Sequence, residues 1–366
     1  MLNGNAPKMV SSYELTKNLL DESVPDPEDF KGKVYPAEDV ESDTRQLDAF
    51  EHTPDYKDIE DQSDSKLLER TFMELSELGD WFGEEEAYED DPDYLALITF
   101  PTAKIDDDFN HVDVVGMIKN ETTGHEIIPF AIDLTFNTDN EDMHKKFKWR
   151  HAYGKKETAP DGVSEFGHTI IEKDSNGSDV LKTYPLPLKD RYGLKIPGFA
   201  STKYYEDKNN PWDPMREKGR IYLMPRFIVG YSTDITEVLS GGMPTEEYRK
   251  KYGEQAYQSR KLEYKNAERR AKWCTLLECA RQASDIRSML ENLSDEETKF
   301  MSKEELEQAK KQIAAMDAYF AKAIEVATEK AKNNPEEMAA KEYVNRDTVC
   351  QAIIFHSYDT YIGKNW

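Results

Sequence analysis

Two aspartates stand inside apolar segments that have the composition of core strands. Asp113 lies in residues 112–118, VDVVGMI, and Asp133 lies in residues 127–136, IIPFAIDLTF. Two ionised carboxylates held close together repel each other, and a divalent cation between them removes that repulsion. An all-oxygen donor set suits Mg²⁺ or Mn²⁺. The two aspartates therefore predict a magnesium or manganese site, provided that their segments are neighbours in one sheet.

Alternation along the second segment separates its two faces. One face is apolar and consists of Ile128, Phe130, Ile132, Leu134 and Phe136. Asp133 shares the other face with Ala131 and Thr135. The turn KNETTGH, residues 119–125, contains a glycine and predicts a hairpin between the two segments. Adjacent strands of a hairpin can bring Asp113 and Asp133 to the same side of a sheet.

A basic segment follows these strands. Residues 143–156, MHKKFKWRHAYGKK, hold six Lys or Arg and no acid, and the acidic stretch NTDNED precedes them. Acids at the start and cations at the end of a segment favour a helix. The segment could steer a phosphate backbone, so a nucleic-acid partner is predicted through Lys145, Lys148, Arg150, Lys155 and Lys156.

The order of the expected elements indicates a mixed α/β (α+β) domain over residues 65–241. Amphipathic spacing predicts a helix over 65–78 in which Leu68, Phe72 and Leu75 share one face. The expected strands are residues 94–101, 112–118, 127–136 and 220–232. Residues 154–215 are rich in Pro, Gly, Asp and Asn and predict a long insertion of loops.

Residues 244–366 have a helical composition and predict a separate C-terminal region. Three helices are expected, over 249–290, 302–332 and 345–362. The first two can pair as a helical hairpin because polar turn residues lie between them. Such helices could serve as a contact for a protein partner. The thiols of Cys274, Cys279 and Cys350 are too few for a disulfide framework and are interpreted as buried helix residues.

The negative charge is concentrated near the N-terminus. The net charge of the chain is −25, and residues 1–108 carry 31 Asp and Glu against 9 Lys and Arg, a net charge of −22. Residues 1–64 are acidic and predict a disordered tail that could contact basic proteins. No apolar run of about 18 residues and no secretory signal is evident, which predicts a cytoplasmic protein without a membrane partner.

Short motifs resemble the PD-(D/E)XK nuclease-like superfamily, in particular small bacterial proteins with GDWF after the first helix and IDVT at the third strand. The matching pieces over residues 65–240 are LLERTFMELSELGDWFGE, VDVVGMI, FAIDLTF, STKYYED and PRFIVGYS. The resemblance implies a core of a helix, three strands, a helix and a further strand. It also implies a hydrolase that cuts phosphodiester bonds with Mg²⁺.

By position, the resemblance makes Asp113 the first metal-binding aspartate, Asp133 the second acid and Glu69 an accessory carboxylate. Thr135 occupies the place of the superfamily's lysine, which stabilises charge on phosphorus. Some members carry that lysine on the following helix, where this chain has Lys145, Lys146 and Lys148.

Two alternatives stay open at this level. Asp113 and Asp133 could be ordinary strand residues that face solvent or pair with Lys or Arg from the insertion. The domain could also be a catalytically inactive nuclease-like scaffold or an acidic interaction protein, since a threonine hydroxyl supplies no positive charge. In one version of this idea the acidic tail folds over the basic segment and competes with nucleic acid.

Overall fold

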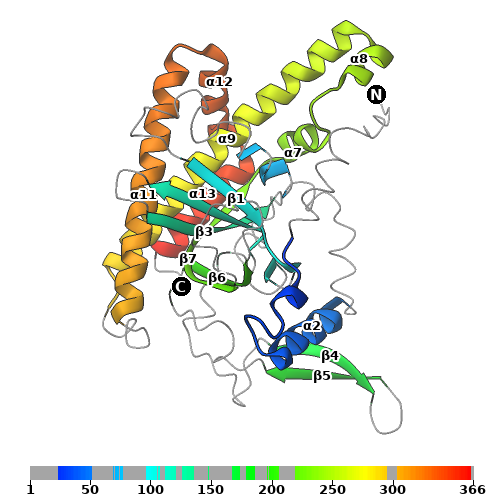
Figure 1. Ribbon diagram of the computed structural model, residues 1–366. Coiled ribbons are helices and arrows are strands. Elements are labelled where there is room, and N and C mark those ends of the chain that lie inside the picture. The colour runs from blue at the N-terminus through cyan, green and yellow to red at the C-terminus, as the bar shows by residue number, and fades with distance from the viewer. Residues whose placement is uncertain are drawn as a thin grey trace.

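The computed structural model describes a mixed α and β fold (Figure 1). The residues described are 24–51, 69, 71–73, 75–76, 96–104, 106–107, 112–120, 126–135, 147, 167–173, 179–185, 196, 198–205, 219–294 and 303–363. The expected fold class is therefore confirmed at the level of a mixed sheet with several helices.

A five-stranded mixed sheet with the order β1-β2-β3-β7-β6 forms the centre of the fold. Its strands are β1 (Ala96–Pro101), β2 (Val114–Asn120), β3 (Glu126–Thr135), β6 (Phe199–Tyr205) and β7 (Gly219–Gly230). Strands β1, β2 and β3 form an antiparallel meander, β3 and β7 are parallel, and β6 pairs antiparallel with β7. The hairpin expected between the two aspartate-bearing segments is thus confirmed.

Two further strands lie in the part of the chain expected to be a loop insertion. Strands β4 (Gly167–Lys173) and β5 (Asp179–Pro185) pair antiparallel in a sheet of their own, and β6 follows them. The parallel pairing of β3 with β7 requires a long crossover, and this insertion belongs to it.

Helices follow the last strand of the sheet. They are α7 (Thr233–Ser240), α8 (Glu246–Tyr252), α9 (Glu254–Glu291), α11 (Lys303–Lys332), α12 (Pro335–Tyr343) and α13 (Thr348–Tyr361), with the short 3₁₀ turn η3 (Val344–Arg346) before α13. Figure 1 shows α9, α11 and α13 lying side by side over the strands, and α9, α11 and α13 each contact β7.

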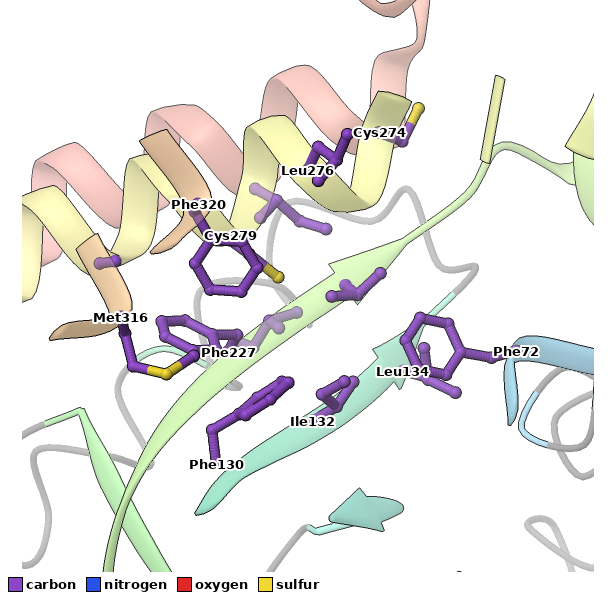
Figure 2. Packing of buried hydrophobic residues seen from close by; sticks show 14 of the residues in the cluster. Phe72, Phe130, Ile132, Leu134, Phe227, Cys274, Leu276, Cys279, Met316 and Phe320 are labelled. Carbon is purple, nitrogen blue, oxygen red and sulfur yellow. The ribbon is translucent and has the colours of Figure 1, made fainter. Parts of the chain in front are cut away.

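The helices and the sheet share one hydrophobic core. Figure 2 shows Phe130, Ile132 and Phe227 of the strands facing Met316 and Phe320 of α11. The rings of Phe227 and Phe320 meet edge to face with centroids 5.5 Å apart. The C-terminal helices therefore form a layer on the sheet, whereas the sequence predicted a separate helical region. The sequence pattern shows that a helix has an apolar face but not which surface that face will cover.

Two polar side chains of α9 hydrogen-bond the free edge of β7. Strand β6 pairs with β7 only as far as Pro225, and among the described residues no strand pairs with the later backbone of β7 on that side. Gln282 accepts from the Ile228 amide at 2.9 Å and donates to the Ile228 carbonyl at 2.7 Å. Glu278 accepts from the Gly230 amide at 3.0 Å. Residues four apart share one helix face, which explains how both reach the same edge.

Residues 24–51 are folded, although they belong to the expected disordered tail of residues 1–64. They form the 3₁₀ helix η1 (Pro27–Phe30) and α2 (Ala37–Glu51). Phe30 and Val40 are fully buried against Tyr204 of β6 and Ala103. The carboxylate of Asp43 pairs with the Lys203 ammonium and accepts from the Tyr204 hydroxyl. A small apolar cluster and these polar contacts hold the acidic segment on the edge strand.

Among the described helices, none combines the length and apolar character that a membrane crossing requires.

Candidate metal centre

The candidate centre lies at the end of β2, where Asp113 is held against β3. The Asp113 amide donates to the Ile132 carbonyl at 3.0 Å. The Asp113 carboxylate in turn accepts from the Leu134 amide at 2.6 Å. Backbone pairing and a side-chain bond to the same strand therefore fix this carboxylate at the junction of β2 and β3.

The second carboxylate of the centre is that of Asp107, in the segment between β1 and β2, and the preceding residue anchors this segment. Asp106 is fully buried, and its two oxygens accept from the Lys203 amide at 2.8 Å and from the Tyr204 amide at 2.9 Å. These bonds satisfy backbone donors of edge strand β6 and tie the segment to it. Asp107, the next residue, is held near Asp113 by this anchor.

The third carboxylate comes from the helix that precedes the sheet. The described residues of this helix, 69, 71–73 and 75–76, are helical, and Phe72 and Leu75 are buried in the main core as the amphipathic pattern predicted. Glu69 lies on this helix and is only 9% exposed. Packing of Phe72 and Leu75 thus sets the position from which Glu69 reaches the sheet.

One oxygen from each of Glu69, Asp107 and Asp113 lies within 4.8 Å of the others. Three carboxylates at this spacing form a donor set suited to a hard divalent cation such as Mg²⁺ or Mn²⁺. Two of the three predicted metal ligands, Glu69 and Asp113, are therefore brought together.

Asp133 is not a member of this group. It forms a buried salt bridge with Arg226 of β7, and each residue is 3% exposed. Strand β7 runs parallel to β3 with Arg226 opposite Ala131, so the guanidinium reaches the carboxylate two residues along on the same face. Pairing with an arginine was one of the alternatives from the sequence, although Arg226 lies outside the insertion.

All of the cationic residues expected at the site lie outside the described residues. This applies to Lys145, Lys146, Lys148, Arg150, Lys155 and Lys156. Within the same segment, Phe147 is fully buried and packs against Tyr361 of α13 with ring centroids 6.3 Å apart. Thr135, in the place of the superfamily's lysine, ends β3 and is 5% exposed.

Asp107 and Arg226 are the residues that the sequence analysis missed as site residues. Asp107 belongs to a run of three acids, residues 106–108, shortly before Asp113. Such a run is a signal for a cation, although this one lacks the spaced oxygens and the glycine of a calcium-binding loop. Arg226 interrupts the apolar strand segment MPRFIVG, and a charge in a buried strand signals a buried partner.

A second buried polar group consists of Glu278, Cys274 and Cys350 and lies where α9 meets the end of β7. Burial raises the pKa of Glu278 well above its ordinary value, against the effect of hydrogen bonds to Gly230 and Cys350. The hydrogen bond to Cys350 lowers the pKa of Cys274, but burial and nearby carboxylates outweigh it and raise that pKa to about 11. All three cysteines are buried, as expected, and these protonated thiols are poor nucleophiles. We therefore interpret Glu278 and these cysteines as part of the packing between α9, α13 and β7, not as catalytic residues.

No protein-family model, curated protein or solved structure matches the chain.

Proposed function

We propose that the protein is a divergent, nuclease-like hydrolase that cleaves phosphodiester bonds of nucleic acid with a divalent cation held by Glu69, Asp107 and Asp113. The observation that carries this proposal is the convergence of these three carboxylates within 4.8 Å. The order of a helix, three strands and a later strand supports the proposal, and the second helix of the core that the resemblance implies falls outside the described residues.

The donor set fits the cation. Carboxylate oxygens are the ligands that Mg²⁺ and Mn²⁺ prefer, and three negative charges in a partly buried place are relieved by a dication. When bound, the cation supplies Lewis-acid polarisation of a phosphate oxygen and lowers the pKa of a bound water. The Leu134 amide orients the Asp113 carboxylate, and the bonds of Asp106 to the Lys203 and Tyr204 amides anchor the segment that carries Asp107.

The proposal assigns Asp133 a different role from the one that the sequence suggested. Arg226 neutralises it in a buried pair, so we infer that Asp133 positions Arg226 and the end of β3 rather than the cation. The positive charge that Thr135 lacks is expected from Lys145, Lys146 or Lys148.

A second candidate function is a catalytically inactive nuclease-like scaffold. The buried Asp133–Arg226 pair and the threonine in the lysine position favour it, since two of the superfamily's three motif positions then lack their chemistry. Such a scaffold could still bind the cation as a structural ion.

The two candidates are separated by measuring metal binding and cleavage on the same protein. Isothermal titration with Mn²⁺ is run on the wild type, on Asp107→Asn and on a control, Glu304→Gln, which removes an exposed carboxylate at the start of α11. Cleavage of plasmid and of single-stranded oligonucleotides is then followed in Mg²⁺ and Mn²⁺.

The nuclease proposal expects Mn²⁺ binding and cleavage by the wild type and the control, and loss of both in Asp107→Asn. Mn²⁺ binding without cleavage supports the scaffold. Cleavage that persists in Asp107→Asn contradicts the proposed site.

A further inference from the structure

Residues 246–272, which comprise α8 and the first half of α9 and are called the basic arm below, have a charge opposite to that of the chain. They contain nine Lys or Arg and five Asp or Glu, a net charge of +4 in a chain whose net charge is −25. A local concentration of cations along a helix is the electrostatic footprint of a polyanion-binding surface.

The basic arm is exposed along most of its length. Helix α8 has no buried residue, and the first buried residue of α9 is Tyr264. Figure 1 shows α8 and the start of α9 extending beyond the sheet. Residues 254–263 span about 15 Å of helix, whereas charges are screened over about 10 Å at 0.1 M salt. The acidic surface of the rest of the protein therefore weakens the field at the end of the arm only slightly.

Eight of the nine cations of the arm fall into two groups, and the ninth is Lys272 at its end. The arginines form salt bridges, from Arg249 to Glu246, from Arg260 to Glu263, from Arg269 to Glu336 and from Arg270 to Asp234. Lys250, Lys251, Lys261 and Lys265 have no salt-bridge partner among the described residues. Lys261 and Lys265 are four residues apart and share a face of α9. These four lysines are available to a partner.

Tyrosine rings are interleaved with these lysines. Tyr252 is 40% exposed and packs on Tyr248 with ring centroids 4.6 Å apart. The Lys251 ammonium lies 4.9 Å from the centre of the Tyr252 ring. Exposed rings beside cations suit a partner that has both phosphates and flat bases, because bases stack on aromatic side chains. An acidic protein would use the cations alone, so the rings favour nucleic acid.

We propose that the basic arm binds the sugar-phosphate backbone of single-stranded nucleic acid through Lys250, Lys251, Lys261 and Lys265, with Tyr252 as a stacking platform. The basic arm is a different stretch of the chain from the basic segment of residues 143–156. The choice of nucleic acid as the polyanion rests on these rings and, in part, on the proposed function.

The test measures binding in EDTA, so that cleavage and metal binding do not enter. Fluorescence anisotropy is recorded for a labelled 20-nucleotide oligothymidylate and for a labelled poly-glutamate peptide at several salt concentrations. The arm variant changes the four lysines to Gln. The matched control changes Lys303, Lys310, Lys322 and Lys332 of α11 to Gln, which alters the net charge equally.

Wild type and control are expected to bind the oligonucleotide with a salt dependence that the arm variant loses in large part. Four lost phosphate contacts reduce the slope of log K against log salt by about 3. Tyr252→Ala is expected to weaken oligonucleotide binding at least several-fold.

Three outcomes overturn the proposal. They are no oligonucleotide binding by the wild type, equal loss in the arm variant and the control, and poly-glutamate binding as tight as that of the oligonucleotide. Circular dichroism of each variant verifies that the helices are retained. Because no metal is present, failure of this test leaves the cleavage proposal standing, and the converse also holds.

Discussion

Arg226 of β7 donates a hydrogen bond to the carboxylate of Asp133 of β3, and the two side chains form an ion pair from which water is almost excluded. Their strands are parallel neighbours, so the pair joins the meander to the strand that returns after the long insertion. A buried pair of this kind is costly to break because it leaves one charge without its partner.

Removing one member of this pair should therefore destabilise the fold strongly. We expect Asp133→Leu or Arg226→Met alone to lower the free energy of unfolding by about 3–5 kcal/mol. The double variant should recover most of that loss, since two apolar side chains need no partner. Urea unfolding of the four proteins measures this coupling, and strictly additive losses would contradict it.

Asp106→Asn should weaken both the fold and the candidate metal centre. The substitution places an amide donor where two backbone amides need acceptors, at a cost of about 1–3 kcal/mol. Because Asp106 positions Asp107, Mn²⁺ affinity should also fall. Asp48→Asn on α2 serves as the control, and titration calorimetry with the urea series measures both effects. Unchanged Mn²⁺ affinity would show that Asp107 is held by other contacts.

Glu278→Gln should alter how stability depends on pH. Burial raises the pKa of Glu278 above its ordinary value of 4.5, so the folded state keeps the proton when the unfolded state has lost it. The contribution of this proton to the free energy of unfolding is fully present below pH 4.5. It is lost as the pH rises toward the raised pKa, by at most about 1.4 kcal/mol per pH unit.

A glutamine side chain at this position would keep an oxygen for the Gly230 amide and has no proton to lose. We therefore expect the Glu278→Gln variant to gain stability relative to wild type between pH 5 and pH 8, as measured by urea unfolding. The control is Glu263→Gln on an exposed part of α9. A parallel pH dependence of the variant and the wild type would argue against a buried neutral Glu278.

Gly230→Ala should loosen the contact between the sheet and α13. A Cβ at this position would lie 2.6 Å from Val349 Cγ1, 2.8 Å from Ile353 Cδ1 and 2.9 Å from the Thr135 carbonyl oxygen. Such crowding costs about 1–3 kcal/mol. Adding Val349→Ala should restore part of the loss, and thermal unfolding of the single and double variants would detect it. No recovery would mean that the contact with the Thr135 backbone dominates.

The local parts of the fold could be predicted from the sequence. Ile128, Phe130, Ile132 and Leu134 alternate along β3 and all enter the main core. Phe72 and Leu75 follow helical spacing and do the same. These patterns are local because a strand or helix repeats over a few residues, and each element must bury one face.

The non-local parts could not be predicted. Nothing near Asp133 in the sequence indicates that Arg226, 93 residues later, will lie beside it, since only the crossover and the parallel register bring them together. Asp107 joins Glu69 and Asp113 for a similar reason, because its position depends on the bonds of Asp106 to β6. Tyr204 also covers Phe30 and Val40, so the acidic segment folds on a surface formed far along the chain.

The side chains of Gln282 and Glu278 take the place of a missing strand along β7, and this has a consequence for dividing the protein. A fragment that ends near Pro244 would leave the Ile228 and Gly230 backbone without these partners. An unprotected strand edge recruits strands from other molecules. Such a fragment should assemble into aggregates, and a shortened version of this protein for further work needs to retain the long helix.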